Sequence, residues 1–472
     1  MRGSRSAELR RQQKRLLLLA LDWTRPKDPP MSLGQASILA KLRQDNISVL
    51  HRSWAVNQKN FKLDAVLQYV MSNADSDVDL ALGAYVWHEP ETQALLSAVR
   101  EAGFPGRIIL GGPQVSYTSS GLEQYYPQAD VFIRGYGESA LAQLLLSDVS
   151  RPPIAGIHYA GEPDLGLSAN VDIDNLPSPY LTGVIKPQRF IRWETQRGCP
   201  FRCAFCQHRE SDITMKRRQF KYSRIMQEIH WILNNPVIQD IAVLDPTFNS
   251  GPYYMDVLHA LIAGNYTGKL ALQCRIEMVR EDFLDAVQTL NKTARVVLEF
   301  GLQTIHREEA KLIQRPNNMR KVSRILLETN ARNIATEVSL IFGLPGQTVQ
   351  SFQDSIKFCK DHGVPTIYAY PLMLLRGTPL HADRVSLGLV ESSDINVAVD
   401  RIQANIPHVV SSPSFTYSDW CRMVEIAETL DRYNAATISS DISSRRAHEN
   451  ATVFWDAPEA AKVYVLEPGA GG

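Results

Sequence analysis

The chain has 472 residues, and its 50 Lys and Arg residues balance 50 Asp and Glu residues, so the net charge is zero. That length is enough for two or three domains that each bury a core. The charge balance argues against a dedicated nucleic-acid binder, and we expect no nucleic-acid partner. Six cysteines are too few for a disulfide scaffold at this length.

The first residues combine a basic tail with an apolar run. Residues 1–14 contain several Arg and Lys residues, and we expect a flexible tail there. The run at 16–21 superficially resembles a secretory signal, but it is short and ends at Asp22 without a small-residue cleavage site. We therefore interpret it as a buried strand. No stretch of the chain approaches the length needed to span a bilayer, and we expect no membrane association.

Predicted strands and helices alternate through residues 15–160. The strands are short apolar runs of the kind found in buried parallel sheets, and Ser32 is a candidate N-cap for the first helix. This alternation is typical of a doubly wound α/β domain. The predicted strands are 16–22, 47–54, 77–87, 107–117 and the start of 129–147, and the predicted helices are 32–46, 61–73, 91–103 and the end of 129–147.

The remainder of the chain divides into four predicted parts. Residues 161–188 are rich in Pro, Gly and Asn and predict a linker with one short hairpin. Residues 189–385 contain six strand candidates separated by helical stretches, which predicts a partial (β/α)6 barrel with its site at the C-terminal strand ends. Residues 386–457 predict a small helical C-terminal cap, with helices at 394–406 and 418–434. Residues 458–472 predict a disordered tail.

Three cysteines lie within eight residues, in the run Cys199-Pro-Phe-Arg-Cys203-Ala-Phe-Cys206. Soft thiolate ligands favour zinc or an iron–sulfur cluster. A structural zinc site takes four ligands, and a 4Fe–4S cluster normally takes four cysteines. Three cysteines leave one metal position open for a substrate or cofactor. The remaining cysteines are scattered and are interpreted as small buried residues; they are Cys274, Cys359 and Cys421.

This cysteine spacing, in the loop after the first of six predicted strand–helix units, resembles the radical S-adenosylmethionine (radical SAM) superfamily. The resemblance covers roughly residues 189–385 and includes Phe205, the run DPTFN, the run GLQT and the run IFGLPGQT. It implies that Cys199, Cys203 and Cys206 bind a 4Fe–4S cluster whose open iron receives S-adenosylmethionine. A structural zinc loop is the alternative. An oxygen-sensitive cluster implies a reducing compartment, so we expect a cytoplasmic protein.

The first predicted domain is similar to the cobalamin-binding domains that precede the barrel in one branch of this superfamily. The residues that carry this similarity are RIILGGPQVSY and FIRGYGES, each of which follows a predicted strand. It implies a Rossmann-like cobalamin-binding domain over residues 15–160. The chain has no D-x-H-x-x-G motif, which leaves open a vestigial domain without cobalamin.

The resemblance also implies site residues. Arg275 could instead form an internal salt bridge with Glu277 or Glu299, and Asp245 could ligate the open iron or cap its turn. The isolated His88 is interpreted as a polar surface residue rather than a cobalt ligand, and Tyr368, Tyr370 and Arg376 as candidates to face substrate. The residues implied for S-adenosylmethionine are Phe205, Asp245, Pro246, Thr247, Arg275, Gln303, Gly343, Leu344 and Pro345, and those implied for cobalamin are Gly111, Gly112, Pro113, Gly135 and Glu138.

The function implied is that of a cobalamin-dependent radical SAM methyltransferase. Its substrate would be a small molecule or a peptide-derived compound of a specialised biosynthetic pathway, methylated at an unactivated carbon. The resemblance further implies an external electron donor such as flavodoxin or ferredoxin, and we expect a monomer. The alternatives left open are a non-methylating radical enzyme, a methylthiotransferase or tRNA-modifying enzyme, and a non-enzymatic sensor.

Overall fold

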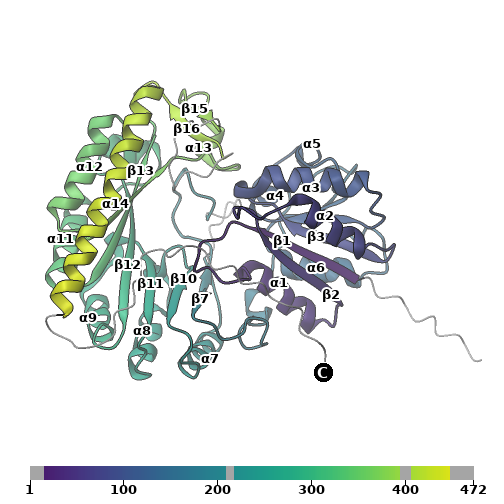
Figure 1. The fold of residues 1–472 in the computed structure, drawn as a ribbon, viewed down its shortest axis with the longest axis horizontal. Helices are drawn as coiled ribbons and strands as arrows, with labels where there is room; N and C mark the ends of the chain where they lie inside the picture. The colour runs from purple at the N-terminus through teal and green to yellow at the C-terminus, as the bar shows by residue number, and fades with distance from the viewer. Residues whose placement is uncertain (1–14, 209–216, 394–405, 447–472) are drawn as a thin grey trace, which may run out of the picture.

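A computed structural model describes residues 15–208, 217–393 and 406–446. The basic tail at 1–14, nearly all of the helix expected at 394–406 and the tail at 458–472 lie outside the described residues. Figure 1 shows two sheets side by side, each with its own helices, and a long helix along the outer edge of the second sheet.

The first sheet has six strands in the order β2-β1-β3-β4-β5-β6. The five expected strands are present and pair in parallel, whereas β6 adds an antiparallel edge strand that was not expected. The strands are β1 (Arg15–Asp22), β2 (Val49–Ala55), β3 (Val78–Gly83), β4 (Ile108–Gly111), β5 (Val131–Ile133) and β6 (Ile157–Tyr159).

Helices cover both faces of this sheet, because alternate residues of β1 are buried in two different clusters. Leu17 and Leu19 pack with residues of the helices on one face, while Leu16 and Leu18 pack with residues of the helices on the other. Ser32 caps the first helix as expected, since its side chain accepts a hydrogen bond from the Gln35 N–H. The helices are α1 (Leu33–Gln44), α2 (Leu63–Ser72), η1 (Val86–His88), α3 (Glu89–Glu101), α4 (Pro113–Ser116), α5 (Leu122–Tyr125) and α6 (Gly137–Leu146).

The second sheet also has six strands, in the order β14-β13-β12-β11-β10-β7, and every pair is parallel. The six strands expected from the sequence are therefore present, and they lie in chain order. Parallel strands in chain order bring all their C-terminal ends to one edge. The strands are β7 (Phe190–Trp193), β10 (Asp240–Val243), β11 (Lys269–Cys274), β12 (Arg295–Gln303), β13 (Ala335–Phe342) and β14 (Thr366–Pro371).

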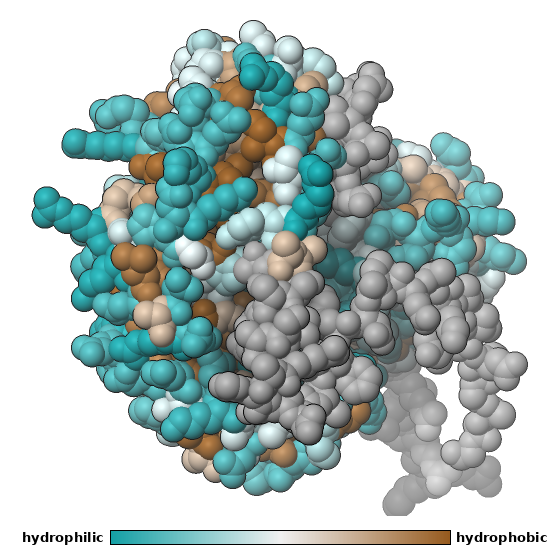
Figure 2. Space-filling model, turned by 60° about the vertical axis from the view of Figure 1, so that its left-hand side comes forward, coloured by the Kyte–Doolittle hydropathy of each residue, from teal (hydrophilic) through white to brown (hydrophobic). Residues whose placement is uncertain are grey.

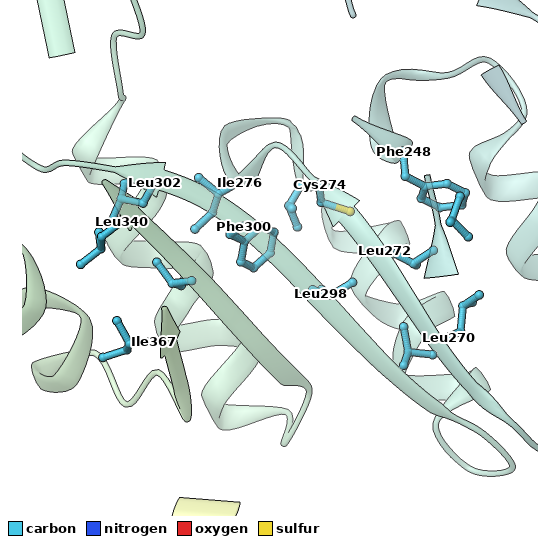
Figure 3. Close-up of a cluster of buried hydrophobic side chains, with 14 of the residues drawn as sticks. Phe248, Leu270, Leu272, Cys274, Ile276, Leu298, Phe300, Leu302, Leu340 and Ile367 are labelled. Atoms are coloured by element: carbon cyan, nitrogen blue, oxygen red, sulfur yellow. The ribbon is translucent and has the colours of Figure 1, made fainter. Parts of the chain in front are cut away.

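Alternate side chains of these strands build the core beneath the helices. In Figure 3, Leu270, Leu272 and Cys274 of β11 lie beside Leu298 and Phe300 of β12. The residues between them on each strand face the concave side of the sheet. The helices and short strands of this half are β8 (Gln196–Arg197), β9 (Arg218–Gln219), α7 (Tyr222–Leu233), η3 (Phe248–Ser250), α8 (Tyr254–Ala263), η4 (Ile276–Met278), α9 (Glu281–Leu290), α10 (Arg307–Leu312), α11 (Met319–Ala331) and α12 (Val349–Asp361).

The connecting and C-terminal segments differ in detail from the expectation. Residues 161–188 contain one 3-10 turn, η2 (Ile173–Asn175), and an isolated bridge between Gly135 and Ala169, but not the expected hairpin. After α13 (Pro379–Ala382), strands β15 (Val390–Ser392) and β16 (His408–Ser411) pair antiparallel. The 30-residue helix α14 (Tyr417–Arg446) then buries Trp420 and Leu430 in the same core as the second sheet.

The face that includes this helix layer carries mostly hydrophilic residues, with hydrophobic residues showing between them (Figure 2). Within the described residues, we find no helix that combines the length and the apolar character required to cross a bilayer.

Candidate functional site between the two sheets

A cavity of about 570 Å³ lies where the C-terminal strand ends of the first sheet face the first loop of the second. Such strand ends are the usual ligand-binding edge of doubly wound sheets. The segment between β1 and α1 reaches across to β7 (Figure 1), where Arg192 pairs with Asp28 at 2.5 Å. The lining includes residues of both halves: Leu18, Ile38, Ala81, Tyr85, Ile109, Gly111, Gly112, Pro113, Gly135 and Glu138 from the first, and Glu194, Gln196, Arg197, Gly198, Leu244 and Pro246 from the second.

Two glycine turns form the wall on the side of the first sheet. Gly112 has a φ of +88°, and a Cβ there would lie 2.7 Å from the Ala84 oxygen. Gly135 has a φ of +78°, and a Cβ there would lie 2.8 Å from the Ala169 oxygen. Only glycine fits both the backbone conformation and the close approach. All five residues predicted for cobalamin line this cavity: Gly111, Gly112, Pro113, Gly135 and Glu138.

Glu138 joins the two halves at this wall. Its carboxylate accepts hydrogen bonds from Arg197 at 2.7 Å and from the Ser37 hydroxyl at 2.9 Å. Burial by itself would raise the pKa of Glu138, but the charge and hydrogen bond of Arg197 hold that pKa below its ordinary value. The carboxylate is therefore ionised at neutral pH and paired across the interface.

The three predicted cysteine ligands lie on the loop after β8, and all three are free thiols. The Cys206 N–H donates to the Cys203 carbonyl at 3.2 Å, so the loop turns back on itself. Burial raises the pKa of Cys206 to about 11, and negative charge on Cys203 and Cys199 adds to the rise. Nevertheless, no three His, Cys, Asp or Glu side chains in the described ranges are arranged around a common metal position.

The chemistry of this loop fits an iron–sulfur cluster better than a zinc ion. It offers three cysteines, one fewer than the four ligands that a structural zinc site takes. Arg315 is buried, its Nη1 lies 3.7 Å from the Cys203 sulfur, and its Nε has no hydrogen-bond partner. A cluster with a cofactor on its open iron would place negatively charged groups beside this unpartnered donor.

Asp245, Pro246 and Thr247 follow β10, beside the cysteine loop. The Asp245 carboxylate accepts hydrogen bonds from the Thr195 N–H at 2.7 Å, the Thr195 hydroxyl at 2.5 Å and the Gln196 N–H at 3.1 Å. Burial raises the pKa of Asp245 to about 7 against the lowering effect of these donors. The sequence left two roles open for Asp245. Its three hydrogen bonds favour capping the turn over ligating the open iron. Thr247 lies 3.6 Å from the Cys199 sulfur.

Arg275 takes the internal salt bridge that the sequence left open. It pairs with Glu277 at 3.2 Å, donates to the Pro316 carbonyl at 3.0 Å and lies over the Phe201 ring at 4.2 Å. These contacts use most of its donors, so Arg315 is the better placed arginine for a ligand at the cysteines. Sequence reasoning missed Arg315 because it belongs to none of the motifs and reaches the loop only through the fold.

The other residues implied for S-adenosylmethionine are spread along the strand ends. Phe205 is partly buried against the core of the second half. Gln303 ends β12 with a φ of +69°, which is unusual for a residue other than glycine. In the turn after β13, the N–H groups of Gly343 and Leu344 both donate to the Gln347 side chain. Pro345 lies in the same turn, which the two hydrogen bonds to the Gln347 side chain hold in place.

One minor expectation was wrong. His88 is fully buried rather than on the surface; its Nδ1 is 2.8 Å from the Thr92 hydroxyl, and burial lowers its pKa to about 4. The Arg376 guanidinium forms two ion-pair contacts with Glu89, at 2.7 and 3.1 Å. Tyr368 and Tyr370 share one face of β14, with ring centres 6.2 Å apart.

The concave face of the second sheet carries two carboxylates in the interior of neighbouring strands. Glu299 of β12 and Glu337 of β13 are directly opposite each other in the parallel register. Burial, followed by the charge of Glu337, raises the pKa of Glu299 to about 7. Burial likewise raises the pKa of Glu337, although Lys269 and Arg295 oppose the rise. The pair can therefore hold a proton at neutral pH.

Comparison with known proteins gives consistent results. Residues 193–359 match the model of the radical SAM superfamily. The cobalamin-dependent radical SAM methyltransferase TokK of Streptomyces tokunonensis is 28% identical over 66% of this chain and 50% of its own length. A 2-(S-pantetheinyl)-carbapenam-3-carboxylate methyltransferase of Streptantibioticus cattleyicolor is 28% identical over 68% of this chain and 50% of its own length. The chain thus spans about half the length of these curated relatives.

Two solved structures share the fold over most of the chain. The methyltransferase TsrM of Kitasatospora setae, with cobalamin and a [4Fe-4S] cluster bound, superposes with a TM-score of 0.69 at 14% identity, covering 88% of this chain and 91% of its own. The cobalamin-dependent enzyme OxsB, with aqua-cobalamin and S-adenosylmethionine bound, gives 0.66 at 13% identity, covering 92% of this chain and 71% of its own. At these identities the likeness establishes the α/β fold alone.

Proposed function

Because the chain contains a radical SAM domain over residues 193–359, we propose that it is a cobalamin-dependent radical SAM methyltransferase. The observation that carries the proposal is the cavity lined both by the two glycine turns of the first sheet and by Gly198 and His208, which lie on either side of the loop of three cysteines. A methyl carrier and a radical generator would have to lie beside one another in such an enzyme. Residues 15–160 would then be the cobalamin-binding domain and residues 189–385 a partial barrel.

The residues that would hold each group follow from their positions. Cys199, Cys203 and Cys206 would bind the 4Fe–4S cluster, and the charge of Arg315 would favour the carboxylate of S-adenosylmethionine beside it. Gly112 and Gly135 would let the corrin approach the backbone. When bound, the cluster with S-adenosylmethionine supplies a carbon radical, and cobalamin supplies the methyl group.

The chain's own contribution is to position these groups and to exclude water from them. The Asp245 carboxylate ties the end of β10 to the segment before the cysteines, and the pair of Arg192 with Asp28 holds the β1–α1 segment across the opening. The substrate would enter the polar concave face of the second sheet. We propose a small-molecule or peptide-derived substrate and an external electron donor such as flavodoxin or ferredoxin.

A non-methylating radical SAM enzyme is the second candidate, since nothing in the cavity distinguishes methyl transfer from cyclisation, ring contraction, oxidation or transfer of a 3-amino-3-carboxypropyl group. The experiment that separates them uses the anaerobically reconstituted chain. We expect about one cobalamin and one 4Fe–4S cluster per chain, and label from methyl-labelled S-adenosylmethionine on the protein-bound cobalamin after reduction. A chain that takes up no cobalamin would contradict the methyltransferase proposal, while cobalamin that stays unlabelled would favour the second candidate.

A further inference from the structure

One arginine side chain connects the cobalamin side of the cavity to the cysteine loop. Arg197 lies two residues before Cys199, and its guanidinium donates to Glu138 at 2.7 Å, to Glu194 at 2.8 Å and to the Ser37 hydroxyl at 3.1 Å. Ser37 in turn donates to Glu138 at 2.9 Å. The contacts therefore close a ring between α1, the first turn of α6 and β8.

This network is buried and forms part of the cavity wall. The side chains of Arg197, Glu138 and Glu194 are 14%, 7% and 16% exposed, and all three residues line the cavity. A buried charge-assisted network with every partner satisfied restricts motion more than a surface ion pair does. Removing one partner leaves a buried charge unpaired, which is costly.

The partners of Arg197 are fixed to both sides of the cavity. Glu138 lies in the first turn of α6, three residues after Gly135, so its position is fixed to the turn that closely approaches Ala169. Gly198 separates Arg197 from Cys199 and has a φ of +76°, so the chain bends sharply into the cysteine loop. A displacement of the guanidinium would therefore move both the glycine turn and the first cysteine.

Other ion pairs also cross between the two halves, and one of them provides a comparison. Arg376 pairs with Glu89 in two contacts, and Glu89 also accepts hydrogen bonds from Tyr126 and Gln114. Neither Arg376 nor Glu89 lines the cavity. This pair holds the halves together without touching the glycine turn at Gly135, and the contact of Arg376 with the cysteine loop is made by its backbone carbonyl, which accepts a hydrogen bond from the Gln207 side chain at 2.9 Å.

From these contacts we infer that Arg197 is a positioning residue that sets the separation between the corrin and the iron–sulfur cluster through its bonds to Glu138 and Ser37. The inference rests on the proposed function, because it concerns the two groups proposed to occupy the cavity. In this inference Arg197 acts through Glu138 and Ser37 rather than on the reacting atoms. Its role is to keep the methyl carrier and the radical generator at one fixed distance.

The test is the magnetic interaction between the two groups in the reconstituted holoenzyme. Reduction gives two paramagnetic centres, cob(II)alamin and the reduced cluster, and the microwave power needed to saturate the cob(II)alamin signal rises when the cluster is close. We expect this enhancement in the wild-type protein, its loss in Glu138→Gln and Arg197→Met, and its partial recovery in Arg197→Lys. Glu138→Gln preserves the shape of the side chain, so this variant carries the test if Arg197→Met folds poorly.

Glu89→Gln is the matched control, since it removes the charge of an inter-half pair whose two residues do not line the cavity. It should retain the wild-type saturation behaviour. Wild-type enhancement in both Glu138→Gln and Arg197→Met would overturn the inference, as would an equal loss in Glu89→Gln. Wild-type protein that binds no cobalamin would instead overturn the proposed function.

Discussion

At the scale of single residues, Glu299 gives the sharpest prediction. Burial and the neighbouring Glu337 raise its pKa to about 7, from an ordinary value near 4.3. The folded state therefore binds the proton more tightly than the unfolded state, so stability falls as the pH rises from about 4.3 through 7. We expect Glu299→Gln to raise the free energy of unfolding by about 2 kcal/mol at pH 8 and by little at pH 4.5.

Urea unfolding at the two pH values measures this difference. Glu425→Gln on the exposed face of α14 is the control, since it removes a carboxylate of the same size without a buried neighbour, and should change stability little at either pH. If Glu299→Gln raised the free energy of unfolding equally at pH 4.5 and pH 8, the gain in stability would not come from removing the Glu299 charge.

The residues that could be identified from the sequence are those that belong to compact local patterns. The cysteine spacing and the two glycine turns are short enough to be seen without the fold, and the structure places the turns on one cavity with the segment that leads into the cysteines. Arg315 and Arg197 were missed because their partners are distant in the chain. His88 was misjudged because nothing in an isolated His–Glu–Pro sequence indicates whether the ring is buried.

At the scale of elements, one amide of α14 supplies both hydrogen-bond partners of a buried residue at the edge of the second sheet. β14 is an edge strand, and Asn434 of α14 accepts from the Ile367 N–H and donates to the Ile367 carbonyl, both at 2.9 Å. Ile367 is fully buried, so both backbone groups need a partner. We expect Asn434→Ala to lower the free energy of unfolding by about 2–4 kcal/mol, because two buried groups lose their partner.

Thermal or urea unfolding measures this loss, with Thr429→Ala as the control on the same helix. The Thr429 hydroxyl is exposed and bonds only within α14, so its removal should cost no more than about 0.5 kcal/mol. Similar losses in the two variants would show that α14 is held by its apolar face rather than by Asn434.

The strands found from the sequence are those of the alternating strand–helix units. Every expected strand of both sheets is present because each is a continuous or alternating run bounded by turn residues. The pairs β5–β6 and β15–β16 were missed because β6, β15 and β16 pair antiparallel outside the alternating strand–helix units, and such strands are stabilised by their pairing rather than by their own sequence. α14 extends from Tyr417 to Arg446, beyond the helix expected to end at 434.

At the scale of the whole molecule, the sequence predicted two α/β halves but not how they face each other. The contacts that join them connect residues far apart in the chain, such as Glu89 with Arg376 and Asp28 with Arg192. No periodic pattern encodes such pairs. The cavity exists only because of them, so its shape could not be read from either half alone.

Because both halves line this cavity, a ligand that fills it should stabilise the molecule as a unit. We expect cobalamin to raise the free energy of unfolding of the wild-type chain by about 2.7 kcal/mol when its free concentration is 100 times the dissociation constant. The shift in thermal unfolding between cobalamin-free and cobalamin-saturated protein measures this gain. It should be lost in Gly112→Ala, where the new Cβ would meet the Ala84 backbone at 2.7 Å.

Gly103→Ala separates the loss of binding from the backbone strain. Gly103 also has a positive φ, of +81°, but a Cβ there would meet no atom within 4 Å, and the residue does not line the cavity. Gly103→Ala should lower the stability of the cobalamin-free protein by about 1–2 kcal/mol, the cost of a left-handed conformation, and Gly112→Ala should lower it further because its Cβ also meets the Ala84 backbone. Only Gly103→Ala should keep the full cobalamin-induced shift. If Gly112→Ala also kept it, the glycine turn after β4 would not be part of the corrin site.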